Sequence, residues 1–273
     1  MQTEVQTKTE VLLKEKNVFV VILNNSKFKE YKILNNAMQN YILSGISYPF
    51  KVLEYNEEDI RKIIKPYLKK GEIIIVLFAN TPLVLKQTIE NIIEYSRVKN
   101  INACKLPCGF VFNSSYIKKN KIIAFDSFYS QNEDEFLEVV DDESLKIATK
   151  ILQARIIKYH AKNGVKFENE QSVVVEPTAE IQSGVVISSN CIIQGNSTIL
   201  NSAIIKENTA IINSEVGRGS SVSNSQILNT TIGNQAIIMP YCYISNSKIG
   251  NSVLIKSNKC LEGVSIEDNK TIE

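Results

Sequence analysis

Residues 181–211 carry a six-residue repeat and read IQSGVV ISSNCI IQGNST ILNSAI IKENTA I. Every block opens on isoleucine: Ile181, Ile187, Ile193, Ile199, Ile205 and Ile211. A small residue follows four positions after each of the first five: Val185, Cys191, Ser197, Ala203 and Thr209. Three short strands per coil explain this period, because one aliphatic side chain then points inward and a small one fits each corner. The repeat predicts a parallel β-helix.

The repeat extends toward the C-terminus with changes of phase. The six-residue step continues at Val222, Ile238, Ile244, Ile255 and Leu261, whereas it slips by one residue at Val216, Ile227, Ile232 and Ile249. Stacked coils bury apolar surface that a single coil leaves exposed. We therefore expect residues 165–273 to form one β-helix.

The first half of the chain has a different pattern. Residues 18–23 (VFVVIL) and 72–78 (EIIIVLF) are the apolar runs typical of buried parallel strands. Helical spacing covers residues 57–68 and a segment that opens at Thr81-Pro82, and further strands are expected at 109–112 and 121–125. This alternation predicts an α/β domain with a mostly parallel sheet over residues 18–141, after an N-terminal extension of residues 1–17.

A long helix is expected between these two parts. Apolar residues recur at helical spacing from Asp142 to about Lys162, and the segment ends before Gly164. Residues 142–164 are therefore interpreted as a helical arm or linker that joins the α/β domain to the β-helix.

Composition excludes several classes of protein. No apolar run approaches the ~18 residues of a membrane helix, and the polar start of the chain lacks the order of a secretory signal. Five scattered cysteines argue for a reducing compartment, and a net charge of +2 without a basic cluster provides no footprint for nucleic acid. We expect a cytoplasmic protein without membrane or nucleic-acid partners.

The coils and the linker Ala161-Lys162-Asn163-Gly164-Val165 resemble a known family. The repeat is similar to that of the left-handed β-helix acyltransferases. The order of α/β domain, arm and coils resembles the bacterial bifunctional N-acetylglucosamine-1-phosphate uridyltransferase / glucosamine-1-phosphate acetyltransferase family, although both domains are shorter here. The resemblance implies a Rossmann-type nucleotidyltransferase-like domain, a left-handed β-helix, a homotrimer, a sugar-nucleotide ligand, and Mg²⁺ and acetyl-CoA where the family sites survive.

The nucleotide-binding loop of that family departs from its pattern here. The family carries Leu-Ala-Ala-Gly-x-Gly-Thr-Arg-Met, whose glycines let backbone N–H groups approach phosphates. The matching stretch runs from Leu23 to Tyr31, with Ser26 and Phe28 replacing the glycines and Glu30 replacing the arginine. Lys27 is a remnant position of the nucleotide site. The favoured interpretation of the stretch is an ordinary strand-to-loop turn.

The family's metal ligands are also altered. Asn80 stands where the family has a Mg²⁺-binding aspartate, and a neutral amide offers one oxygen without charge. The second ligand aligns loosely with Glu143, whose acidic neighbours also suit a helix N-terminus. Of the family's Asn-Thr-Gly substrate contact only Gly109 remains, after Pro107 and Cys108. Asn80 and Gly109 are remnant nucleotide-site positions and Glu143 is a remnant metal-ligand position.

The acetyltransferase site lacks its base in the coils. A histidine there deprotonates the amine in the family, but the single histidine of this chain, His160, lies in the arm. Ser245, in the stretch from Pro240 to Asn246, replaces the arginine that binds substrate phosphate. His160 is interpreted as a packing or exposed residue. Cys104 and Cys108 are interpreted as structural because no zinc-ligand set completes them. Cys191 and Cys242 are interpreted as structural because they fit small or interior positions of the coils.

Three functions remain open from the sequence. The chain is interpreted first as a degenerate homologue of the bifunctional transferase, without confident catalytic residues, that acts in binding, regulation or structure. The second hypothesis is a pure assembly module built on the coils. The third is an active sugar-nucleotide or acyl transferase with a rearranged site. Asn80, Glu30 and the absence of a coil histidine favour the first two.

Overall fold

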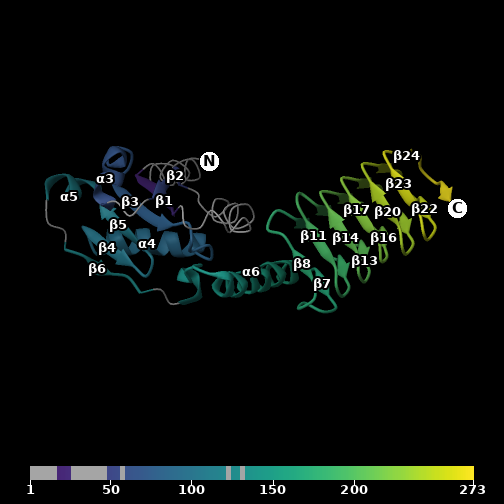
Figure 1. The fold of residues 1–273 in the computed structure, drawn as a ribbon, viewed down its shortest axis with the longest axis horizontal. Coiled ribbons are helices and arrows are strands. Elements are labelled where there is room, and N and C mark those ends of the chain that lie inside the picture. The colour runs from purple at the N-terminus through teal and green to yellow at the C-terminus, as the bar shows by residue number, and fades with distance from the viewer. Residues whose placement is uncertain (1–16, 26–47, 56–58, 121–123, 130–132) are drawn as a thin grey trace, which may run out of the picture. The chain divides into compact units, whose positions relative to one another are not determined.

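The structure, a computed structural model, describes residues 17–25, 48–55, 59–120, 124–129 and 133–273. The chain divides into two compact units between Ala148 and Thr149. The N-terminal unit contains a mixed α/β sheet and the C-terminal unit a β-solenoid (Figure 1). In the described part of the chain, no helix combines the length and apolar character needed to cross a membrane.

Six strands form the N-terminal sheet in the order β2-β1-β3-β5-β4-β6. Their bounds are β1 Val18–Asn25, β2 Phe50–Tyr55, β3 Ile73–Phe78, β4 Ala103–Leu106, β5 Gly109–Asn113 and β6 Asp126–Ser127. β1 pairs in parallel with β2 and β3. β5 is antiparallel to β4, with which it forms a hairpin through the turn at Pro107-Cys108, and it is also antiparallel to β3. The sheet is therefore mixed.

The central strands are buried on both faces, which explains their uninterrupted apolar runs. Val18, Val20 and Ile22 pack on one side with residues of helix α4 (Lys86–Val98), and Phe19 and Val21 pack on the other side beside α3 (Ile60–Ile64). The remaining helical segments are η3 Lys65–Tyr67, α5 Ser114–Lys119, η4 Glu133–Phe136 and α6 Asp142–Lys162.

Three predicted element bounds change in the structure. The helix expected from residue 57 is α3 from Ile60, with Asp59 as its N-cap, followed by the 3-10 turn η3. The helix expected from Thr81 begins at Lys86, because the buried carboxylate of Glu135 accepts hydrogen bonds from the Leu85 N–H (3.4 Å) and the Thr88 hydroxyl. Of the strand expected at 121–125, residues 121–123 lie outside the described residues, and β6 starts after it.

The solenoid has about six turns, each with one strand on each of three faces. The first face holds β7 Lys166–Phe167, β10 Val186–Ile187, β13 Ile204–Ile205, β16 Ser221–Val222, β19 Ile237–Ile238, β22 Leu254–Ile255 and β25 Thr271–Ile272. The second holds β8 Val174–Val175, β11 Ile192–Gln194, β14 Ala210–Ile212, β17 Gln226–Leu228, β20 Tyr243–Ser245 and β23 Cys260–Glu262. The third holds β9 Glu180–Ile181, β12 Thr198–Ile199, β15 Glu215–Val216, β18 Thr231–Ile232, β21 Lys248–Ile249 and β24 Ser265–Ile266. All of these strands pair in parallel with the next coil.

The predicted interior register is confirmed. The six isoleucines of the repeat and the five small residues between them are all at most 8% exposed. The phase slips are shortened corners: the step between interior residues falls from six, Ile193 to Ile199, to five, Ile211 to Val216. A residue with positive φ, such as Asn213 (φ 47), turns the shortened corner, since asparagine tolerates this conformation.

Buried hydroxyl groups connect successive coils. The Ser214 hydroxyl donates to the Ile212 carbonyl oxygen (2.7 Å) and accepts from the Thr230 N–H (3.0 Å). The Thr230 hydroxyl in turn accepts from the Ser247 N–H (3.2 Å). The Ser214 and Thr230 hydroxyls thus each satisfy a backbone N–H of the next coil that burial would otherwise leave unpaired.

Helix α6 covers the edge of the first coil. The Gln153 amide donates to the Val175 carbonyl oxygen (3.0 Å), and its oxygen accepts from the Val175 N–H (3.1 Å). This side chain pairs with β8 as a neighbouring strand would. At this position α6 therefore caps the edge of the first coil, which has no preceding coil to pair with.

Candidate functional site

A pocket of about 370 Å³ lies beside the end of β3 in the N-terminal unit. Asn80 and Gly109, two of the positions predicted for the nucleotide site, both line it. Lys27 lies outside the described residues, as do Ser26, Phe28 and Glu30 of the same loop. Two polar residues that the sequence did not single out as site residues, Lys105 and Glu138, also line the pocket.

Asn80 is held in place from the segment that follows η4. Its side-chain nitrogen lies 3.5 Å from a carboxylate oxygen of Glu138. Its backbone carbonyl oxygen accepts a hydrogen bond from the Val139 N–H (2.7 Å). Val139 is fully buried and Asn80 is 9% exposed. Both contacts join residues more than fifty positions apart, so no local motif in the sequence marks them.

Glu138, and not Glu143, is the acidic residue of the pocket. Glu143 is exposed in the first turn of α6, where acidic residues favour the positive end of the helix dipole. The Ser144 N–H donates to the Asp141 carboxylate (2.8 Å), which begins this helix. The helix-terminus interpretation of the acidic cluster agrees with this placement.

Gly109 is required by the packing of the sheet. Its φ of 135° lies in a region that side chains rarely adopt, and a Cβ atom here would lie 2.4 Å from the Val76 carbonyl oxygen of β3. The close approach of β5 to β3 explains this glycine without a substrate contact.

The Cys104 and Cys108 thiols of this unit are buried. Burial, with a smaller effect from the neighbouring Glu138 carboxylate, raises the pKa of the Cys108 thiol to about 12. Burial, followed by the Asp126 charge, raises the pKa of Cys104 to about 11. Both thiols stay protonated near neutral pH and are poor nucleophiles and metal ligands.

The described lining of the pocket does not fit Mg²⁺. Among these lining residues Glu138 is the only carboxylate, and the residue beside it is the neutral Asn80. Among the residues that the structure describes, no three His, Cys, Asp or Glu side chains gather as a metal site would require.

The two residues compared with the family's acetyltransferase site, His160 of the arm and Ser245 of the coils, both lie buried. His160 lies on α6 and is 6% exposed, and its Nδ1 has no hydrogen-bond partner in the described part of the chain. Burial lowers the pKa of this imidazole, so it is neutral at physiological pH. Ser245 is buried on β20, and its hydroxyl also lacks a partner among the described residues.

The chain thus combines an α/β unit, which contains the pocket, with a β-solenoid. No family model matches the sequence, and no curated protein matches it. Among solved structures, the acetyltransferase domain of PglB from Neisseria gonorrhoeae is similar at 12% identity and a TM-score of 0.28, over 93% of this chain and 91% of that chain. A similarity this weak carries no argument about function.

Proposed function

We propose that this chain is a non-catalytic binding and assembly protein, a degenerate homologue of the bifunctional transferase, in which the pocket beside β3 takes a sugar nucleotide. The contact of Asn80 with Glu138 supports this proposal. The described lining at this point then consists of one carboxylate and one neutral amide, and not of the carboxylate pair that would hold a metal ion. Among the described residues that line the pocket, Lys105 is the one with a cationic side chain, and it pairs with the diphosphate.

An active transferase with a rearranged site is the alternative. Glu138 favours it, since a carboxylate in the pocket supplies one oxygen ligand for Mg²⁺. Uridylyl transfer needs a triphosphate bridged by a metal ion and a loop that holds the phosphates in line for attack. One carboxylate meets neither requirement.

Nucleotide binding without turnover is the expected result of a direct test. In thermal-shift measurements UDP-N-acetylglucosamine should raise the Tm, with or without Mg²⁺, by mass action on the folded state. Lys105→Glu should abolish this shift, whereas Lys99→Glu, the same charge change at an exposed residue outside the pocket, should retain it.

A pyrophosphate-release assay separates the two alternatives. We expect no detectable Mg²⁺-dependent turnover of UTP and N-acetylglucosamine-1-phosphate by the unaltered protein, and none by Asn80→Asp. Loss of one electrostatic donor alone costs roughly 10²- to 10³-fold in rate. Turnover near about one per second, a typical enzymatic value, would establish the active transferase instead.

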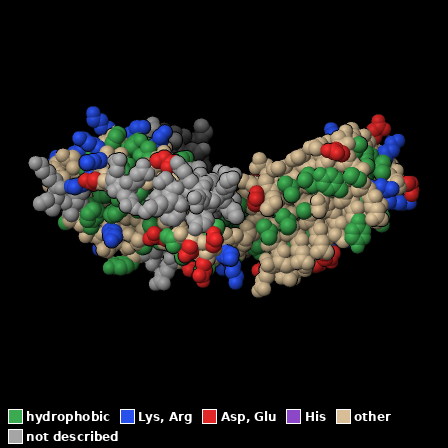
Figure 2. Space-filling view, in the orientation of Figure 1, with side chains coloured by type: hydrophobic (Ala, Val, Ile, Leu, Met, Phe, Trp, Pro, Cys, Tyr) green, Lys and Arg blue, Asp and Glu red, His purple; other side chains and the backbone are tan. Residues whose placement is uncertain are grey.

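The solenoid is also proposed to assemble the protein as a homotrimer. Outward-facing Ile204 and Ile237 on the first face are 40% and 50% exposed, and Ile192 and Tyr243 on the second are 38% and 39% exposed. Outward strand positions on the third face are polar: Glu180, Thr198, Glu215, Thr231, Lys248 and Ser265. Hydrophobic side chains gather along the solenoid in Figure 2. Apolar ridges on two faces of a prism suit a closed ring of copies.

Light scattering after size-exclusion chromatography should give three times the 30.7 kDa monomer mass. Ile204→Lys combined with Ile237→Lys should produce monomers, because charges then lie on the first-face ridge. Thr231→Lys, on the third face, should leave the trimer intact. A monomer mass for the unaltered protein at micromolar concentration would contradict the assembly.

A further inference from the structure

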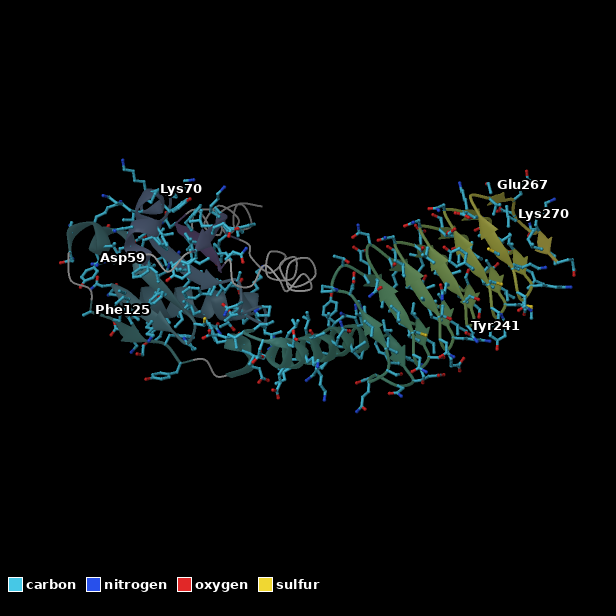
Figure 3. The ribbon with its side chains drawn as sticks, in the orientation of Figure 1. Asp59, Lys70, Phe125, Tyr241, Glu267 and Lys270 are labelled. Carbon is cyan, nitrogen blue, oxygen red and sulfur yellow. The ribbon has the colours of Figure 1, made fainter. Side chains whose placement is uncertain are left out.

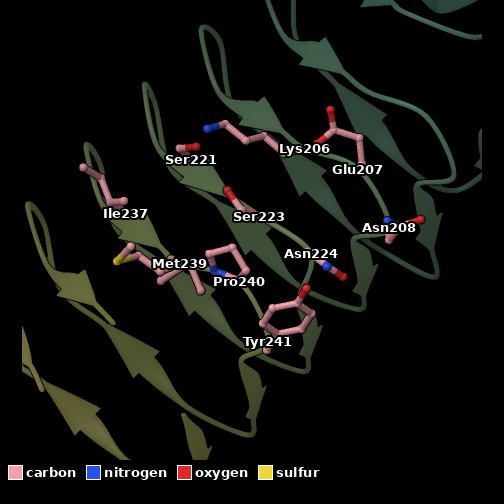
Figure 4. A pocket seen from close by; sticks show the side chains of 11 residues that line it. Lys206, Glu207, Asn208, Ser221, Ser223, Asn224, Ile237, Met239, Pro240 and Tyr241 are labelled. Atoms are coloured by element: carbon pink, nitrogen blue, oxygen red, sulfur yellow. The ribbon is translucent and has the colours of Figure 1, made fainter. Parts of the chain in front are cut away.

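A groove of about 440 Å³ crosses the corner between the first and second faces of the solenoid (Figure 4). Its floor consists of the small residues Ser221, Ser223 and Asn224 of one coil. Lys206 and Glu207 of the preceding coil line one side. Residues 239–241 of the following coil (Met-Pro-Tyr) line the other side. We call this feature the corner groove.

The corner groove arises from a shortened corner. Interior residues on either side of this corner are six positions apart in the coils before and after it, at Ile205 and Ile211 and at Ile238 and Ile244, but five apart at Val222 and Ile227. The middle coil therefore recedes between its neighbours. Adjacent coils are spaced by roughly 4.8 Å, so the backbones of the flanking coils lie roughly 10 Å apart.

Tyr241 breaks the pattern of this corner. The residue with positive φ is asparagine in the other coils: Asn190, Asn208, Asn224 and Asn258. Tyr241 adopts the same conformation (φ 65), which is costly for a bulky residue, and its side chain is 67% exposed at the edge of the solenoid (Figure 3). Packing of the coil does not require this tyrosine, and its exposed ring borders the groove.

The remaining groups of the corner groove have free hydrogen-bonding capacity. Among the described residues, the side chains of Ser221, Ser223 and Asn224 have no hydrogen-bond partner, and Lys206 and Glu207 form no ion pair. One lysine and one glutamate are the charged residues of the lining, so its net charge is zero. This balance gives no preference for a phosphorylated ligand.

From these features we infer that the corner groove binds an uncharged saccharide. The apolar C–H face of a sugar ring stacks on the exposed Tyr241 ring, and its hydroxyl groups pair with the short polar side chains of the floor. The site lies within one chain and in a different unit from the pocket beside β3. It therefore stands independently of the function proposed for that pocket. The corner groove shares Ile237 with the first-face ridge proposed for assembly, so a neighbouring copy and a sugar compete for this residue.

Tyr241→Trp supplies a direct reporter, because the chain contains no tryptophan. The variant should keep the aromatic platform, and its emission should change saturably on titration with glucose, galactose, mannose or N-acetylglucosamine. Tyr129→Trp, at an 84% exposed position in the N-terminal unit, should show no saturable change. Absence of a saturable response to every sugar would overturn the inference. Tighter binding of glucose 6-phosphate than of glucose, or an emission change with protein concentration alone, would also overturn it.

Tyr241→Asn separates binding from folding. It installs the residue of the equivalent corners, so the Tm should stay equal or rise, while the affinity measured by calorimetry for the best sugar should fall at least about tenfold. A lower Tm with unchanged affinity would assign Tyr241 a structural role and would refute the site.

Discussion

Replacement of Ile193 by aspartate should unfold the solenoid. Ile193 is fully buried at the centre of β11, where it pairs with Val175 of the preceding coil and Ile211 of the following one. A carboxylate at this position has no charged partner inside the coils. Its burial costs about 4 kcal/mol or more, which is comparable with the total stability of many domains. Circular dichroism melting should show loss of the solenoid transition, with aggregation on size-exclusion chromatography.

Asn196→Asp is the matched control, because it introduces the same carboxylate at an exposed position. Asn196 is exposed three residues further along the coil, and its hydrogen bond to the Asn213 side chain comes from the backbone N–H (3.2 Å). The variant should melt within a degree or two of the unaltered protein, as is usual for surface substitutions. Equal melting temperatures for the two variants would show that the interior register is wrong.

Gly233→Ala should be the second large destabilisation. Gly217, Gly233 and Gly250 stack at one corner, and a Cβ atom on Gly233 would lie 2.6 Å from the carbonyl carbon of Gly250. The backbone has little freedom to move away, because the Gly233 N–H is bonded to the Ile249 carbonyl oxygen (2.8 Å). Overpacking of this kind costs roughly 3 kcal/mol, which lowers the Tm of a domain this size by roughly 12 °C.

Gly219→Asn is the control, because it adds a side chain to the same corner at a position where the backbone leaves space for one. Gly219 has φ 66, and a Cβ atom there would meet only the Gln235 side chain at 3.9 Å. Asparagine occupies equivalent positive-φ positions, such as Asn269, so this variant should retain the original Tm within a few degrees. A drop equal to that of Gly233→Ala would show that any side chain at this corner is destabilising, and that the close backbone contact at Gly233 is not the specific cause.

Local periodicity explains why the sequence alone predicted the solenoid interior. Each coil repeats the same geometry, so the spacing of Ile187, Ile193 and Ile199 directly states which side chains point inward. The apolar runs of β1 and β3 were equally readable, because burial on both faces removes any need for alternation. Even the shortened corners were visible as phase slips before any contact was known.

Contacts between distant residues decided the rest. The start of α4 depends on Glu135, and the surroundings of Asn80 depend on Glu138, each about fifty positions away or more. Neither carboxylate has a local sequence signature. The corner groove likewise required three coils to be stacked before the small residues between Lys206 and Tyr241 became its floor. The sequence by itself determined which residues repeat and which are buried within each coil or strand. Only the tertiary structure decided which polar groups meet, because their proximity follows from the packing of separate elements.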